Sequence, residues 1–266
     1  MTYAAVSRRI LPTPETLRPW IAGIGTVTVD DVPTETFIHL PEAATKVVIR
    51  GEASGDRSIL VVGPRARASY HRGKRFISCV ELRLAPGLVR PLLGVRAVEL
   101  VGRAVPLGDL PGVTARRLAA ELRRLDPEES LEHLTQVLPE RLASTADRAR
   151  TELVRAGVDA MSIRSGRAPA HVGDVARELA VSERQLRNLF AEGVGLSPKH
   201  FARISRVRTV LDHAATRPWA DLAAATGYYD QAHMTTDFRT LMGVPPRSYF
   251  TGRLPQATPC QALPRL

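Results

Sequence analysis

Apolar residues recur with two different spacings along this chain of 266 residues. In the N-terminal part, short runs of β-branched residues alternate with polar residues and are broken by Gly, Pro or Asp, as half-buried strands are. In the C-terminal part, apolar residues return every three or four positions, which is the period of an amphipathic helix. The pattern therefore predicts an α+β chain with two domains, a β-rich one followed by an all-helical one.

The strand-like runs lie in the first third of the chain. We expect strands at Ile24–Val29, Thr36–Leu40, Lys46–Arg50, Ile59–Val62 and Phe76–Leu84. A short helix, Leu88–Leu93, follows the last of them. Short strands separated by turns are typical of a small sandwich or barrel. We therefore expect residues 1–113 to form a cupin-like or incomplete β-barrel.

Leucine-rich stripes predict helices between the two domains. Leu118 begins the first stripe and Leu153 begins the last, with prolines dividing the segment. We assign residues 114–165 to a helical linker. Such faces pack within one chain or against a second subunit, so a homodimer stays open. The Pro-rich residues 254–266 are expected to form a disordered tail.

The helical domain, residues 166–253, contains a repeat. Four pairs of landmarks share one offset of 48 residues: Phe190 and Phe238, Gly195 and Gly243, Pro198 and Pro246, and Phe201 and Tyr249. Repetition at a fixed offset means that one supersecondary unit is used twice. Two similar units suggest a protein that reads two neighbouring sites on a repeating partner, for which double-stranded DNA is the obvious candidate.

Each copy of the repeat contains two short helices joined by a turn. In the first copy, Ala176 supplies the small side chain where the helices cross, and Ser182 is the expected N-cap of the second helix. In the second copy, Ala223 and Asp230 take these places. Two helices joined in this way form a helix-turn-helix, whose second helix enters the major groove of DNA.

One long helix is predicted between the two copies. The segment Pro198–Arg217 has apolar residues at helical spacing and is long enough for about five turns. A rigid helix of this length would hold the two reading helices roughly one duplex turn apart, about 34 Å. Its other face carries Lys199, Arg203, Arg206 and Arg208.

The second copy carries a family resemblance. Its stretch G-Y-Y-D-Q-A-H-M-T-T-D-F-R-T-L-M-G-V-P-P-R-S-Y, Gly227–Tyr249, resembles the signature of the AraC/XylS family of transcription regulators. The resemblance covers about residues 170–250 and implies a bacterial, sequence-specific DNA-binding protein. The segment R-L-A-P-G-L-V-R-P-L-L-G resembles part of the sensor domain of some AraC-type regulators. It implies an N-terminal domain that binds a small-molecule effector or a second subunit, and it makes RNA polymerase a plausible partner.

The side chains that would read DNA are those that the apolar stripes leave exposed. In the first copy, similarity to the family places Arg184, Arg187 and Asn188 in base-reading positions, and Arg and Asn pair bidentately with guanine and adenine. In the second copy, the free positions are Gln231, Ala232, His233, Thr235 and Thr236. The same similarity places Gln231, His233 and Thr236 toward the groove. Many members of the family carry an arginine where this chain has Thr236. Arg239 and Arg247 are better placed for phosphates, which position a protein without specifying sequence.

The alternative for each of these residues is a solvated helix face. The repeat favours DNA contact for Arg184 and Arg187, whereas for His233 and Thr236 the two interpretations stand even. The candidate effector residues of the N-terminal domain are His39, Arg65, Tyr70, His71 and Glu81. Their alternative is ordinary strand-edge polarity, since barrel strands alternate their faces. No tight H-x-H spacing is present, so we expect neither a metal nor another cofactor.

Composition adds little to this picture. The chain has 37 Lys and Arg against 27 Asp and Glu, a formal charge of +10 that fits a polyanionic partner. Its two cysteines, Cys79 and Cys260, form neither a disulfide framework nor a zinc motif. The sequence shows no signal peptide and no long apolar run, so we expect a cytoplasmic protein without a membrane partner.

Two alternatives to an effector-controlled regulator remain. The first is a DNA-repair enzyme that transfers alkyl groups and borrows the same DNA-binding domain, which needs a reactive thiol. Cys79 lies in an apolar strand, where a thiol is expected to be inert, so we do not expect an enzyme. The second is a regulator without a ligand, whose N-terminal domain only dimerises, and the sequence does not separate it from the first hypothesis.

Overall fold

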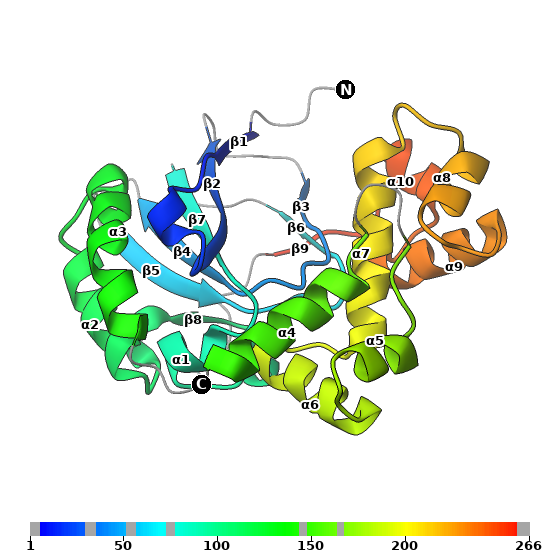
Figure 1. The fold of residues 1–266 in the computed structure, drawn as a ribbon. Coiled ribbons are helices and arrows are strands. Elements are labelled where there is room, and N and C mark those ends of the chain that lie inside the picture. Colours follow the sequence, from blue (N-terminus) through cyan, green and yellow to red (C-terminus); the bar gives the residue numbers. More distant parts are fainter. Residues whose placement is uncertain are drawn as a thin grey trace.

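The computed structural model describes residues 6–29, 36–51, 57–72, 78–143, 148–163 and 168–259. An N-terminal β-sheet region lies beside a C-terminal helical domain, and most of the linking helices, coloured green, pack on the side of the sheet away from that domain (Figure 1). The predicted α+β, two-part organisation is therefore confirmed. Within the described ranges, no helix combines the length and the apolar character needed to cross a membrane.

The larger sheet has six antiparallel strands. Its order is β1 (Val6–Leu11), β2 (Ile21–Val29), β7 (Ser78–Leu84), β4 (Lys46–Gly51), β5 (Arg57–Val62) and β8 (Ala104–Pro106). In β4, Val47 lies opposite Leu82 of β7 and Val61 of β5. Val47 and Ile49 face the main core, while Val48 faces a smaller cluster on the opposite side. Because successive side chains of a strand point to opposite faces, β4 is buried on both.

The smaller sheet has three strands and includes the end of the described chain. Its order is β3 (Thr36–His39), β6 (Ser69–Arg72) and β9 (Thr258–Pro259). β9 runs parallel to β6, and the Thr258 hydroxyl lies 3.3 Å from the Tyr70 carbonyl oxygen to which it donates. The expected disordered tail is therefore not seen at Thr258–Pro259, because the open edge of β6 offers partners that the sequence does not reveal. Residues 260–266, including Cys260, lie outside the described chain. Within the described residues, neither sheet closes on itself. Of the two expected folds, cupin-like or incomplete β-barrel, the incomplete barrel is the one that matches.

The short helix expected at Leu88–Leu93 and two helices from the predicted linker cover one face of the larger sheet. α1 (Val89–Leu93), α2 (Val113–Leu122) and α3 (Pro127–Ala143) bury their apolar stripes in the main core, together with the 3-10 turns η1 (Glu15–Leu17), η2 (Ala97–Leu100) and η3 (Leu107–Asp109). Glu121 joins α2 to α3, since Arg141 and His133 each place a nitrogen 2.8 Å from its carboxylate. The hydrogen bonds from Arg141 lower the pKa of Glu121 to about 2.

The last linker helix belongs to the C-terminal domain instead. α4 (Arg148–Met161) buries Val154 and Met161 in the core of the first copy of the repeat. At Gly157 the approach is close, because a Cβ there would lie 3.0 Å from the ring of Phe190. The apolar stripes of the linker are thus used within the chain, shared between its two parts.

The repeat is visible as two helical units with separate cores. The C-terminal helices are α5 (Val172–Glu178), α6 (Glu183–Gly193), α7 (Pro198–His213), α8 (Trp219–Ala225), α9 (Gln231–Met242) and α10 (Pro246–Phe250). We call α5 and α6 the first unit, and α8 and α9 the second unit. Phe190 and Phe238, equivalent in the repeat, are fully buried in the two cores. α7 ends at His213 rather than Arg217, and Pro218 disfavours helical geometry at Arg217 itself.

Replacing Phe190 with alanine tests how far the first unit depends on its core. The ring is fully buried and meets Phe201 edge to face at 5.7 Å between centroids. We expect Phe190→Ala to lower the free energy of unfolding by about 3–5 kcal/mol, because the cavity cannot fully close. Urea denaturation followed by circular dichroism measures the change.

The control is Tyr229→Ala, since the side chain of Tyr229 is 94 % exposed. We expect it to change the free energy of unfolding by less than about 0.5 kcal/mol. Equal effects of the two substitutions would contradict the described core.

Candidate nucleic-acid interface

The first candidate reading helix, α6, begins at a well-formed cap. The Ser182 hydroxyl accepts a hydrogen bond from the Gln185 amide at 3.1 Å, which satisfies one of the unpaired donors at the start of the helix. Leu186, Leu189 and Phe190 are buried, so they fix which side of α6 faces away from the protein. That outer side carries the predicted reading residues Arg184, Arg187 and Asn188, all of which are exposed.

The two arginines on α6 have different surroundings. Arg187 forms an ion pair with Glu183 one turn earlier, and both side chains are about half exposed. An exposed pair of this kind contributes little stability, so Arg187 can exchange its partner at little cost. For Arg184, no ion-pair partner is found among the described residues. Both guanidinium groups are therefore accessible to a partner outside the protein.

The second candidate reading helix, α9, is built in the same way with a different cap. The Asp230 carboxylate accepts a hydrogen bond from the His233 amide at 2.7 Å. Met234 and Phe238 are buried, which turns the opposite side of the helix outward. The His233 ring packs edge to face against Tyr228, with 5.2 Å between centroids.

The predicted residues of α9 are not equally accessible. Gln231, His233 and Thr236 are exposed, whereas Thr235 is only half-exposed. The Thr236 hydroxyl donates to the Ala232 carbonyl oxygen at 2.9 Å, so its proton is used inside the helix and its methyl group remains for outside contact. The two predicted phosphate contacts, Arg239 and Arg247, are both exposed.

Tyr229 is a candidate that the sequence analysis missed. It directly precedes the Asp230 cap of α9 and is the most exposed large apolar side chain of the described residues, at 94 %. Its neighbour Tyr228 is buried in the second unit. The sequence does not show which of the two adjacent tyrosines faces outward. The repeat does not show it either, because Val181, the equivalent of Tyr229, is partly buried.

The basic face predicted for the long helix is largely committed to contacts within the protein. Arg203 pairs with Asp237 of α9 at 2.8 Å, and the Arg206 guanidinium lies 5.4 Å from the centre of the Tyr228 ring. Arg208 turns to the sheet region instead. These three arginines tie α7 to its neighbours, whereas Lys199 of the same predicted face is exposed.

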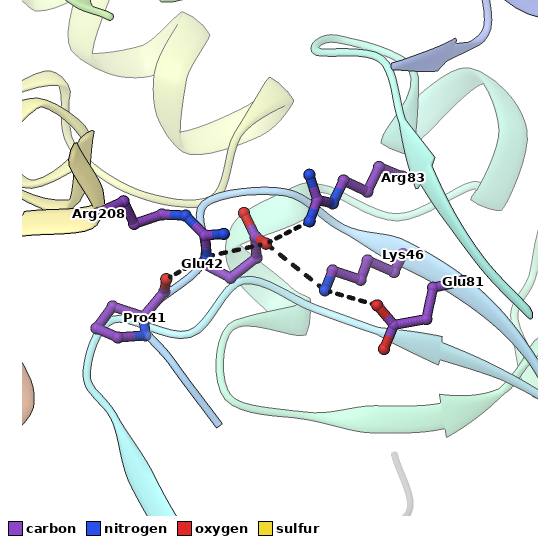
Figure 2. Close-up of polar contacts among 6 residues, drawn as sticks. All are labelled: Pro41, Glu42, Lys46, Glu81, Arg83 and Arg208. Atoms are coloured by element: carbon purple, nitrogen blue, oxygen red, sulfur yellow. Dashed lines mark hydrogen bonds and ion pairs between the residues drawn. The ribbon is translucent and has the colours of Figure 1, made fainter. Parts of the chain in front are cut away.

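A buried cluster of charges joins α7 to the sheet region (Figure 2). The Glu42 carboxylate, just before β4, lies 3.3 Å from Arg208, 3.5 Å from Lys46 and 3.8 Å from Arg83. Lys46 also contacts Glu81 at 3.1 Å. Burial alone raises the pKa of Glu42, but the charges of Arg208, Lys46 and Arg83 outweigh it and hold the pKa below its ordinary value.

The structure brings together some of the predicted effector residues. His39, Arg65 and Glu81 line a cavity of about 260 Å³. Glu42, Lys46 and Arg208 of the charge cluster line it as well. His71 lies outside the cavity, with its ring 5.4 Å from that of His39. Within the described chain, no three His, Cys, Asp or Glu side chains form a group suited to a metal ion.

Tyr70 has a different place from the one expected of an effector ligand. Its hydroxyl donates to the Met242 carbonyl oxygen at 2.6 Å, at the end of α9. Burial raises the pKa of Tyr70 to about 12, so the hydroxyl stays protonated and able to donate at neutral pH. Tyr70 therefore contacts the C-terminal domain and does not line the cavity.

The charge cluster gives a prediction for stability as a function of pH. Because the pKa of Glu42 lies below its ordinary 4.5 in the folded protein, its contribution is complete above about pH 5 and is lost as pH falls through the folded pKa. Glu42→Gln leaves buried cations without their carboxylate, so we expect about 3 kcal/mol less stability at pH 7. Urea denaturation at several pH values should show this difference shrinking below pH 5.

A matched control is Glu152→Gln, which breaks an exposed ion pair with Arg148. Such pairs contribute less than about 1 kcal/mol. A difference between wild type and Glu42→Gln that stayed constant down to pH 3 would contradict the lowered pKa.

Comparisons with known proteins agree with the geometry of the two units. Residues 175–252 match the family model of a helix-turn-helix domain. Comparison with curated proteins gave no match. Among solved structures, the chain is similar to the C-terminal domain of AraT, a response regulator from Geobacillus stearothermophilus, with 24% identity over 39% of this chain and 88% of that one and a TM-score of 0.35.

Two further solved structures are similar over different lengths. An AraC-type transcriptional regulator from Chromobacterium violaceum has 20% identity over 40% of this chain and 95% of that one, with a TM-score of 0.35. ToxT from Vibrio cholerae has 13% identity over 86% of this chain and 97% of that one, with a TM-score of 0.39. Since these similarities are low, the family match carries the assignment. Residues 175–252 are a helix-turn-helix domain by this match.

Proposed function

We propose that this protein is a sequence-specific transcription regulator that reads two adjacent major grooves of double-stranded DNA. The observation that carries the proposal is the repetition of one exposed surface: α6 and α9 follow equivalent turns, bury equivalent phenylalanines and direct polar side chains outward. A helix that is buried on one side and polar on the other after such a turn is the reading element of a helix-turn-helix. The action is binding, and it needs no cofactor.

The two reading helices carry side chains that are suited to different bases. In the first unit, Arg184, Arg187 and Asn188 are suited to guanine and adenine edges. In the second unit, Gln231 and His233 offer hydrogen bonds, and Thr236 offers its methyl group to thymine. Thr235, being half-exposed, contributes less.

Contacts to the DNA backbone would set the position of both helices. Arg239 and Arg247 are exposed on the second unit and suit phosphates, which fix register without specifying sequence. Tyr229, whose hydroxyl can also donate to a phosphate, joins them. α7, with 16 residues, is about 24 Å long and spaces the two units for neighbouring grooves on one side of the duplex.

Control of DNA binding is assigned to the N-terminal region. The cavity lined by His39, Arg65 and Glu81 is a place for a small-molecule effector, and it adjoins the contact between Glu42 and Arg208. An effector there shifts the equilibrium between conformations by its difference in affinity for them. A homodimer and contact with RNA polymerase complete the proposed partners. Such a regulator would act in the bacterial cytoplasm, where the chromosome lies.

The alkyl-transfer alternative gains no support. Cys79 is buried in β7, where its thiol is shielded from DNA. Cys260 lies outside the described residues. A regulator whose N-terminal domain only dimerises remains the alternative to effector control.

Selection of bound sites from a random double-stranded DNA library tests the proposal. We expect wild type to enrich two half-sites about one duplex turn apart. Arg187→Ala should relax one half-site and His233→Ala the other, each by about 1–3 kcal/mol, because each removes a contact to a base.

The control is Arg177→Ala, which removes an equal charge from α5, where Arg177 pairs with Asp174 and is 79 % exposed. It should leave both half-sites unchanged. If wild type enriches no sequence and binds only weakly in a salt-sensitive way, base reading by the two helices is refuted.

A further inference from the structure

Both reading helices end against the sheet region at equivalent positions of the repeat. The amide of Gly87 donates to the carbonyl oxygen of Gly193 in α6 at 3.2 Å, and the amide of Ala68 donates to that of Leu241 in α9 at 2.7 Å. Gly193 and Leu241 are separated by the same 48 residues as the other landmarks. The last carbonyl groups of a helix have no partner within it, so the sheet region supplies partners to both.

A second contact strengthens each of these ends. At α9, the Tyr70 hydroxyl donates to the carbonyl oxygen of Met242 at 2.6 Å. After α6, Gly195 lies so close to the sheet region that a Cβ there would be 2.7 Å from the Ala97 carbonyl oxygen. These second contacts fall on Met242, next to Leu241, and on Gly195, two residues after Gly193. The sheet region therefore contacts neighbouring positions at the ends of both reading helices.

The helix between the units is also held from the sheet region. Arg208 donates to the Pro41 carbonyl oxygen at 3.1 Å and contacts Glu42 (Figure 2). About two turns earlier on α7, the His200 ring lies 2.9 Å from the Ala66 carbonyl oxygen. Ala43, next to Glu42, packs against the cores of both units.

These contacts matter because the two units have separate hydrophobic cores joined through α7. Each unit packs on a different part of α7, with Ala202 in the first core and Val207 in the second, so within the helical domain the separation of the two units depends on this one helix of about 24 Å. The sheet region contacts α6, α7 and α9 at once. It thereby constrains the angle and the separation between α6 and α9, which α7 alone does not fix.

The contacts leave the reading surface open. The sheet region touches the C-terminal ends of α6 and α9, whereas Arg184 and Arg187 lie in the N-terminal half of α6, and Gln231 and His233 in that of α9. All four side chains are exposed while the contacts are made. Holding the helices and reading DNA are therefore compatible.

We infer that the N-terminal sheet region is a brace that fixes the relative placement of α6 and α9, with Tyr70 and Arg208 as its positioning residues. As far as it concerns DNA, this rests on the proposed function, and it adds that the brace selects the spacing between the half-sites. The placement of the helices is a property of the protein alone and can be measured without DNA.

The first experiment measures the separation of the reading helices in the full chain. Spin labels are attached to cysteines in Gln185→Cys and Thr240→Cys, both exposed positions, with Cys260→Ser and with Cys79 left buried. Pulsed electron paramagnetic resonance gives the distribution of distances between the labels. We expect one narrow distribution, which becomes about twofold broader in Tyr70→Phe/Arg208→Gln because both units then pivot more freely.

Two features keep this experiment decisive. Arg208→Gln leaves Lys46 and Arg83 beside Glu42, so no buried carboxylate is left without a cation. The matched control, Tyr228→Phe/Arg217→Gln, makes the same chemical changes at a buried hydroxyl without a described partner and at an exposed arginine. If the test variant is no broader than this control while its circular dichroism is unchanged, the brace is overturned.

The second experiment uses DNA with the two selected half-sites separated by spacers of different length. We expect wild type to prefer one spacer by tenfold or more, and Tyr70→Phe/Arg208→Gln to lose most of this preference while keeping the same half-site sequences. An unchanged spacer preference would refute the role of the brace in spacing. Failure of wild type to select any half-site would refute the proposed function, and the spin-label distances would still decide whether the brace exists.

Discussion

The buried carboxylate of Glu42 is the interaction on which the arrangement of the molecule depends. Removing a charge from water costs several kcal/mol unless opposite charges and hydrogen bonds replace the water. Here the replacements come from both parts of the chain, since Lys46 and Arg83 belong to the sheet and Arg208 to α7. The cluster is complete only when α7 lies against the sheet. Because Arg208 reaches Glu42 only in this arrangement, the cluster stabilises the docking of α7 against the sheet.

The C-terminal domain could be predicted in detail because its signals are local. Ser182 and Asp230 cap the helices that they were expected to cap, and Gly195 and Gly243 adopt positive φ angles of 88° and 78° where the helices end. Caps and left-handed glycines act within a few residues, so a sequence shows them directly. The outward faces of α6 and α9 follow from the same local pattern.

The sheet region was harder to predict, because strand pairing depends on residues far apart. Predicted strands such as Lys46–Arg50 are present, but β1, β6 and β8 were missed: β1 and β6 are rich in polar residues, and β8 has three residues. Tyr70 shows the limit most clearly. Its sequence context suggested a ligand contact, whereas its partner is Met242, 172 residues away. The cavity, the charge cluster and the contacts behind the reading helices share this long-range origin.

The pairing of β9 with β6 has a topological consequence. The helical domain leaves the sheet region through α4 and returns to it at Thr258–Pro259, so it is in effect an insertion between two segments that belong to the same body. A domain attached by one linker explores a wide range of orientations, whereas one attached at both ends behaves as a closed loop with a high effective concentration of its own docking surface. Thr258 and Pro259 thus tie the chain that leaves the helical domain back to the edge strand β6.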